Sequence, residues 1–190
     1  DIERAAELGY RIKLLGLTSL SDAGLSQRVH PCLVDLNTSI AHVSGVTNAV
    51  VAEGDQIGQA FFEGPGAGAG PTASAVAADI IDIARGNTHP VLHGGSPAPT
   101  VSIEGLECRY YMRLSVADRP GVLAQVTSVL GDEKVSMEDF LQRHPDSDDA
   151  VPVVLTTHET DEARMMRAVE RIAKLDFVAE RPELIRIETF

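Results

Sequence analysis

The 190-residue chain is 44% hydrophobic and 23% charged, a composition typical of a soluble globular protein rather than of a disordered one. Its formal net charge of −12 is spread along the chain without a basic stripe, which argues against nucleic acid and against an anionic membrane surface as partners. No apolar run approaches the ~18 residues of a membrane span. The two cysteines, Cys32 and Cys108, are too few for a disulfide framework, so we expect a cytoplasmic protein.

The first residues already follow a helical pattern. Ile2, Ala5 and Ala6 share one face of a helix that Asp1 would cap and Gly9 would end. The chain has neither an initiator methionine nor a signal peptide. We therefore expect it to be part of a longer protein.

A strand-rich segment is expected next. Pro31 lies within one of its strands, which is typical of an edge strand or a β-bulge. Glu53, Gly54 and Asp55 separate two β-rich runs and predict a hairpin. The expected elements are strands at 10–17 and 25–35, a helical turn at 39–42, and hairpin strands at 46–53 and 56–63.

Residues 64–76, GPGAGAGPTASAV, carry four glycines at alternate positions and lead into a helix expected from Pro71 to Arg85, with Gly86 after its end. The run satisfies the dinucleotide fingerprint only in its loose form, and a hairpin precedes it. No lysine is present for a P-loop. Two interpretations stay open. Backbone N–H groups and the helix N-terminus would suit a closely approaching electron-rich or planar ligand, or the glycines let the alanine-rich helix pack against a neighbour.

Residues 87–107 contain three prolines and three glycines and predict a linker. His89 and His93 have the spacing of metal ligands on a helix, but Pro90 lies between them and no carboxylate cluster completes a site. We expect surface histidines and no metal site. Nothing in the chain resembles a nucleophile elbow, and we expect no catalytic constellation.

The second half predicts the order β-α-β-β-α-β, typical of a ferredoxin-like fold. In the segment DRPGVL, Asp118 could cap the first helix, Pro120 could start it, and Gly121 could allow close backbone approach. A free N–H group there could bind a carboxylate, or the segment could simply initiate the helix. Thr160 is the expected N-cap of the second helix. The expected elements are strands at 109–116, 135–143, 150–158 and 182–190 and helices at 118–131 and 159–175.

Several motifs, in this order, resemble the late catalytic-domain segment of homoserine dehydrogenase: VHP, SGVTNAV, EGD and GPGAGAGPTASAV. Residues 109–190, with the loop DRPGVL, resemble an ACT domain. The resemblance covers essentially the whole chain. It implies an α+β fold: the strand-rich end of a catalytic and dimerisation domain at 1–88, a linker at 89–107, and a ferredoxin-like ACT regulatory domain at 108–190.

The resemblance implies an NAD(P)-dependent oxidoreductase that interconverts L-homoserine and L-aspartate 4-semialdehyde, on the route to threonine and methionine. In that family the Rossmann domain and the catalytic residues precede the region seen here. We therefore expect no catalytic residue in this chain, no activity from it alone, and NAD(P) bound mainly by the N-terminal domain. Gly68, with Gly66 and Thr72 beside it, matches the part of the glycine loop that approaches the cofactor.

For the ACT part, Asp118, Gly121 and Val122 match the usual effector loop. Threonine is the expected feedback ligand by analogy, and a homo-oligomer, dimer or tetramer, is expected because ACT domains generally pair. One alternative is a free-standing ACT-type amino-acid-sensing protein without catalysis. Another is the tail of a different ACT-bearing biosynthetic enzyme, against which the upstream SGVTNAV and the glycine block argue.

Overall fold

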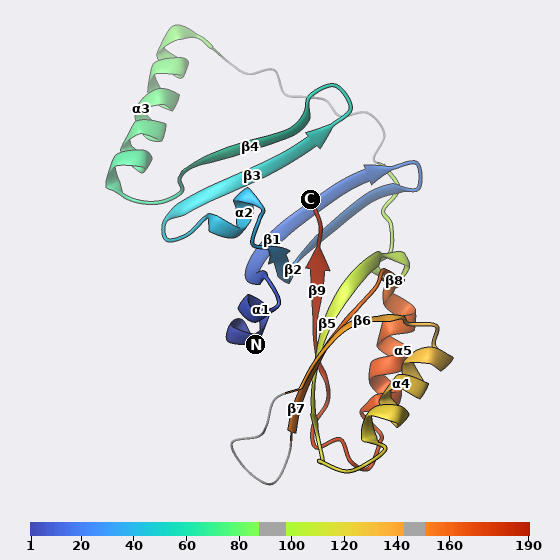
Figure 1. The fold of residues 1–190 in the computed structure, drawn as a ribbon. Helices are drawn as coiled ribbons and strands as arrows, with labels where there is room; N and C mark the ends of the chain where they lie inside the picture. The colour runs from blue at the N-terminus through green and yellow to red at the C-terminus, as the bar shows by residue number, and fades with distance from the viewer. Residues whose placement is uncertain (88–97, 143–150) are drawn as a thin grey trace. The chain divides into compact units, whose positions relative to one another are not determined.

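The computed structural model describes residues 1–87, 98–142 and 151–190, which fall into two compact units (Figure 1). The first unit joins Asp1–Asp35 to Ala98–Phe190, and the second is Leu36–Pro97. None of the helices in the described part of the chain is long and apolar enough to cross a bilayer.

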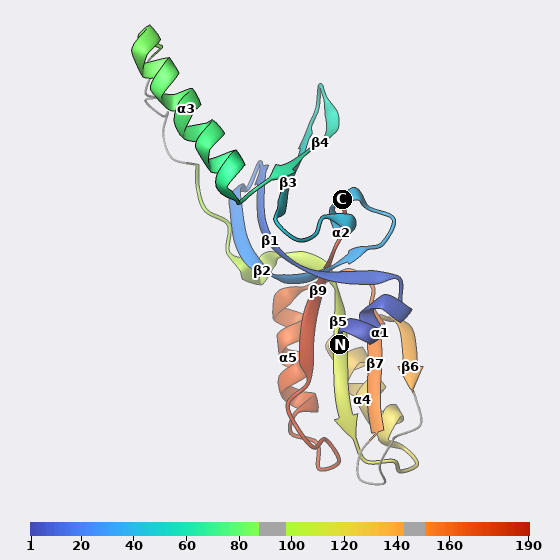
Figure 2. The ribbon, with the colours of Figure 1, turned by 90° about the vertical axis from the view of Figure 1, so that its left-hand side faces the viewer.

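The described strands of the first unit form one sheet in the order β1-β2-β9-β5-β7-β6, with β8 pairing beside them on β5. Figure 2 shows β9, β5, β7 and β6 side by side. The strands are β1 (Tyr10–Ser21), β2 (Gly24–Asp35), β5 (Glu107–Val116), β6 (Met137–Gln142), β7 (Val151–Thr157), β8 (Thr160–Asp161) and β9 (Glu183–Glu188). The helices are α1 (Ile2–Glu7), the 3₁₀ turn η1 (Ile103–Gly105), α4 (Val122–Asp132) and α5 (Glu162–Ile172).

The predicted β-α-β-β-α-β order is confirmed in β5, α4, β6, β7, α5 and β9. Alternate residues of β5 point to opposite faces of the sheet, as a strand requires. Tyr110, Met112, Leu114 and Val116 join α4 and α5 in the main hydrophobic core. An α+β fold with both helices on one face of an antiparallel sheet follows from this pattern.

The other face of this sheet is covered by α1, which lies opposite α4 and α5 in Figure 1. Ala5 of α1 packs with Leu33 and Tyr111 in a second core cluster. The Asp1 carboxylate makes no capping hydrogen bond, contrary to expectation. It accepts instead from the Tyr111 hydroxyl at 2.9 Å and from Arg113 Nε at 2.7 Å, so it ties α1 to β5.

The β1–β2 hairpin joins this sheet through β2, which pairs in parallel with β9 at residues 32–34 and 186–188. Pro31 lies immediately before the paired segment, and the β1–β2 register passes it without a shift. Pro31 therefore lies in a part of β2 that pairs with β1 and has no partner in β9, which fits the edge-strand alternative. Packing groups residues 1–35 with 98–190. The domain boundaries at 88 and 107 stay a prediction about the order of parts along the chain.

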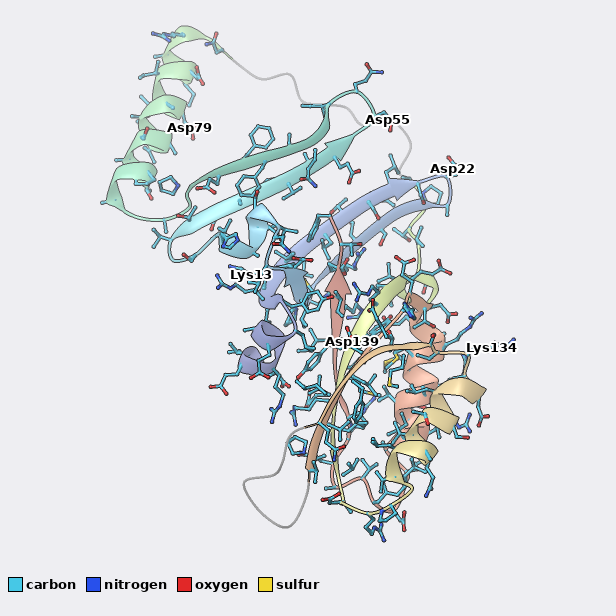
Figure 3. All side chains as sticks on the ribbon, viewed as in Figure 1. Lys13, Asp22, Asp55, Asp79, Lys134 and Asp139 are labelled. Carbon is cyan, nitrogen blue, oxygen red and sulfur yellow. The ribbon has the colours of Figure 1, made fainter. Side chains whose placement is uncertain are left out.

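The second unit consists of α2 (Ser39–His42), the antiparallel hairpin strands β3 (Thr47–Gly54) and β4 (Gly58–Pro65), and α3 (Ala69–Arg85). Asp55 marks the turn of this hairpin and Asp22 that of the β1–β2 hairpin (Figure 3). The predicted helical turn at 39–42 is confirmed, and α3 begins two residues before Pro71. Gly86 ends α3 in the left-handed conformation, with φ 72°, as predicted.

Two expected helix caps were wrong by one or a few residues. Helix α4 begins at Val122 after an N-cap at Gly121, so Asp118 and Pro120 lie in the loop before it. Helix α5 is capped by Asp161, whose carboxylate accepts from the Arg164 N–H at 2.9 Å. Thr160 is held in β8 opposite Cys108, which removes it from the capping position.

Gly24 generates a stability prediction, since it combines φ +129° with a close backbone neighbour. A Cβ there would lie 2.1 Å from the Pro99 carbonyl oxygen, which accepts from the Leu25 N–H at 2.7 Å. We expect Gly24→Ala to lower the free energy of unfolding by about 2 kcal/mol, through backbone strain and steric overlap.

Urea unfolding measures this effect, with Gly16→Ala as the control. A Cβ at Gly16 would lie 3.8 Å from Val29 Cγ2, an ordinary contact. Equal midpoints for the two variants would show that the contact with Pro99 does not constrain residue 24.

Candidate functional site

The glycine loop connects the end of β4 to α3 and turns at Gly68. This residue is the N-cap of α3, with φ +117° and ψ 161°, a conformation open to glycine and rarely to other residues. Thr72 lies in the first turn and donates its N–H to the Gly68 carbonyl at 3.2 Å. The first N–H groups of a helix have no acceptor within it. The loop therefore presents backbone donors with almost no side chain in front of them.

Gly66 is glycine for a different reason. A Cβ at this position would lie 2.2 Å from Nδ2 of Asn48, which occupies the space beside it. The Gly66 N–H donates to the Val46 carbonyl at 2.8 Å, which holds the loop against β3. Sequence reasoning missed Asn48, although it lies within the motif SGVTNAV. Gly66 thus fixes the shape of the loop.

Helix α3 leaves its apolar side chains exposed within the described residues of its unit. Val76 is 53% exposed, Ile80 61% and Ile81 47%, and no residue of α3 is buried. The interpretation that the glycines serve helix packing therefore finds no neighbour among residues 36–87. Gly66, Gly68 and Thr72 are all exposed in the same loop and first turn.

The effector-loop residues Asp118, Gly121 and Val122 come together at a cavity of about 390 Å³ in the first unit. The cavity lies between the ends of β5, β6 and β7 and the N-terminus of α4. Gly121 adopts φ +89°, and a Cβ there would meet nothing within 4 Å. Glycine is thus needed for the turn and not for close approach by the protein itself. The cavity is lined by residues 116–124, Gln142, Val151 and Val153.

The cavity combines apolar walls with a few polar groups at one side. Val122, Val151 and Val153 form the buried wall. Asp118 supplies a carboxylate, and Arg119 supplies a guanidinium that lies 3.8 Å from Asp176 in an exposed, weak ion pair. An anion is favoured at the N-terminus of a helix. The arrangement suits a zwitterion with a small side chain, because its carboxylate, ammonium and apolar part each meet a matching group.

The two thiols are not candidates for nucleophiles. Burial raises the pKa of Cys32 to about 12 and that of Cys108 to about 11. Thiolate, the reactive form, is then scarce at neutral pH. Within residues 1–87, 98–142 and 151–190, no three histidine, cysteine or carboxylate side chains gather into a metal-binding group. The predicted surface histidines His89 and His93 lie outside the described residues.

Comparison with known proteins places both halves of the chain. Residues 1–81 match the family model described as homoserine dehydrogenase, and residues 110–177 match that of the ACT domain. Homoserine dehydrogenases from Neisseria gonorrhoeae and Pseudomonas aeruginosa are 40% and 38% identical over 199 aligned positions. These alignments cover 100% and 99% of this chain and 46% of each relative. The chain thus spans about half the length of the curated relatives it matches.

A solved structure gives the same result. The homoserine dehydrogenase of Thiobacillus denitrificans aligns with a TM-score of 0.86 and 39% identity, over 99% of this chain and 44% of that one. The homoserine dehydrogenase of S. aureus, at 22% identity and a TM-score of 0.63, shows a similar fold over the whole chain.

The contact between Gly66 and Asn48 generates a prediction for the loop. We expect Gly66→Ala to destabilise the second unit by about 1–3 kcal/mol, the usual cost of overpacking. Adding Asn48→Ala removes the overlapping side chain and should restore most of that loss. The rate of limited proteolysis within residues 36–87 reports the local unfolding.

The control for this experiment is Gly70→Ala, since a Cβ at Gly70 meets nothing within 4 Å and alanine is favoured in a helix. Equal cleavage rates for Gly66→Ala and the double variant would remove Asn48 from the explanation.

Proposed function

Residues 1–81 of this chain belong to the homoserine dehydrogenase family and residues 110–177 to the ACT domain family, and on this premise we propose that the chain is the C-terminal portion of a homoserine dehydrogenase. The whole enzyme would interconvert L-homoserine and L-aspartate 4-semialdehyde with NAD(P), for threonine and methionine biosynthesis in the cytoplasm. One observation carries the proposal. The two relatives described above, both homoserine dehydrogenases, align along 99% or more of this chain and so cover both of its units.

The glycine loop is proposed to face the nicotinamide cofactor, with Gly68 at the closest approach. Its donors are backbone N–H groups at the start of α3, and residues 64–76 contain no charged side chain. Such a surface fits a large anionic and planar group that needs close backbone approach. Thr72 adds a hydroxyl in the first turn, and Gly66 acts through loop shape because Asn48 fills the space beside it. NAD(P) bound there would supply the hydride acceptor or donor of the reaction.

The exposed apolar side chains of the second unit support a role as a contact region. Val50 and Phe62 face each other across the β3–β4 hairpin and are 62% and 61% exposed. Apolar faces of this kind mark interaction surfaces. We assign the α3 face to the nucleotide-binding domain and the hairpin to subunit contacts in a homodimer or tetramer. Groups that would move protons are proposed to lie in the rest of the enzyme, so this chain alone would be inactive.

The cavity at Asp118, Gly121 and Val122 is proposed to bind an amino-acid effector, with L-threonine as the feedback ligand. The first-turn N–H groups of α4 and Arg119 would hold its carboxylate, Asp118 its ammonium group, and the valine wall its side chain. An effector that binds one state of the enzyme more tightly shifts the enzyme toward that state by the difference in affinity.

Gly68→Val in the full-length enzyme tests the loop. We expect kcat/KM for the nicotinamide nucleotide to fall at least about tenfold, since a branched side chain would occupy the approach path and φ +117° disfavours it. Steady-state kinetics with circular dichroism measures turnover and folding together.

Gly9→Val is the matched control, because Gly9 also has a positive φ of +83° but lies outside the loop. If Gly68→Val has the same kinetics as this control, the loop does not face the cofactor.

Isothermal titration of this chain with L-threonine tests the cavity. We expect saturable binding that Asp118→Asn weakens about tenfold or more, the usual loss for a charged hydrogen bond. Asp132→Asn, at the other end of α4, should bind like the unmodified chain. An absence of binding, or an equal Kd for both variants, would contradict the proposed threonine site.

A further inference from the structure

Strand β9 is paired on both of its edges, with strands of different parts of the chain. Residues 183–187 pair with β5, which belongs to the ACT domain. Residues 186–188 pair with Cys32, Leu33 and Val34 of β2, in the segment of homoserine dehydrogenase type. One continuous strand therefore hydrogen-bonds the regulatory domain to the β1–β2 hairpin.

The pairing with β2 is held by a nearly buried ion pair. Glu188 is 8% exposed, and its two carboxylate oxygens accept from Arg28 Nε at 3.3 Å and Nη2 at 2.8 Å. His30 Nε2 lies 3.5 Å from the same carboxylate. A two-point contact of this kind fixes direction as well as distance. We call Arg28 and Glu188 the β2–β9 clamp.

A second ion pair, two residues before Glu188, joins β9 to helix α5 of the ACT domain. Arg186 donates through Nε, at 2.8 Å, and Nη2 to the Glu162 carboxylate at the start of α5. The Tyr110 hydroxyl of β5 donates to the same carboxylate at 2.7 Å. Burial and the hydrogen bonds with Cys108 and Glu162 raise the pKa of Tyr110, so this hydroxyl keeps its proton. Arg186 and Glu188 share one face of β9, since side chains alternate along a strand.

Strand β5 connects these contacts to the effector cavity. Val116, at one end of β5, lines the cavity, and Tyr110 near the other end joins the Glu162 network, about 20 Å away along the strand. Beyond the β2–β9 clamp, β2 ends at Asp35, and the chain continues directly into the unit that carries the glycine loop. The clamp thus lies where the ACT domain meets the polypeptide that leads to that loop.

We propose that Arg28 and Glu188 are positioning residues of a regulatory joint, through which an amino acid bound in the cavity changes the stability of the β1–β2 hairpin and of the chain that follows. The inference rests on the proposed effector function. The joint couples the two parts because β9 cannot shift relative to β2 without separating a nearly buried carboxylate from its guanidinium, which is costly.

Hydrogen exchange on this chain, with and without L-threonine, tests the joint. Two peptides are followed: 117–124 reports the cavity and 24–35 reports β2. We expect L-threonine to slow exchange in both, and in 24–35 by at least about fivefold, the lower end of typical coupling free energies. In Glu188→Gln, L-threonine should still slow exchange in 117–124, but by less than about twofold in 24–35.

Arg171→Gln is the matched control. Arg171 also makes two ion pairs, with Asp132 and Glu133, but these join α4 to α5 away from β2. This variant should keep the threonine response of both peptides. A loss of the response in Glu188→Gln alone would then not be explained by a general loss of stability. Arg28→Lys keeps the positive charge without the two-point contact and should show an intermediate response. Arg28→Lys also replaces Glu188→Gln as the test of the joint if Glu188→Gln does not fold.

The outcomes separate the joint from the effector proposal. If L-threonine slows exchange in 117–124 but not in 24–35 of the unmodified chain, the joint is wrong and the effector site stands. If L-threonine slows exchange in neither peptide, threonine is not the effector. The joint is then tested by comparing exchange rates of the variants without ligand. Glu188→Gln should then speed exchange in 24–35 at least about fivefold relative to Arg171→Gln, and equal rates would overturn the joint.

Discussion

The pairing of β9 with β2 on one edge and β5 on the other is the constraint on which the first unit depends. Without it, β1 and β2 would form an isolated two-stranded hairpin, which is marginally stable in water. Several of its apolar side chains face solvent, among them Leu14 at 71% and Val29 at 74% exposure. With it, Cys32, Leu33 and Val34 become fully buried. The same pairing places α1 over the open face of the ACT sheet, where Ala5 meets Tyr111.

The two candidate sites differ in the groups that they offer to a ligand. The glycine loop offers backbone N–H groups and a shape fixed by Asn48, which suits contact with a bound cofactor. The cavity at Asp118 offers charged groups beside an apolar wall, which suits recognition of a small amino acid. Both thiols are buried with raised pKa values, and no metal-binding group occurs among the described residues. Positioning and regulation are the roles that we propose for the loop and the cavity.

Local patterns in the sequence predict most of the helices and strands. They do not predict the contacts between residues that are far apart in the chain. The alternation through Tyr110, Met112 and Leu114 marks β5, and the glycine at 86 ends α3 as expected. The pairing of Cys32 with Arg186 joins residues more than 150 positions apart and leaves no local signal. Asp1 has the residue type and position of a helix cap. Its true partners, Tyr111 and Arg113, lie far along the chain, so the sequence around Asp1 does not reveal them. Thr160 has the residue type of an N-cap, but it lies in β8, a two-residue strand that is too short to recognise from sequence.

The assignment of the glycine loop as a site stays a prediction, and its shape depends on a contact that the sequence does not reveal. The loop residues Gly66, Gly68 and Thr72 lie together as the motif suggests, but the space beside Gly66 is set by a side chain from the opposite strand. The most direct test of the central claim is NAD(P)-dependent oxidation of L-homoserine, measured on this chain alone and on a protein of the relatives' length that contains it. We expect turnover from the longer protein and none from the chain alone. Turnover by the chain alone, or none by the longer protein, would contradict the assignment.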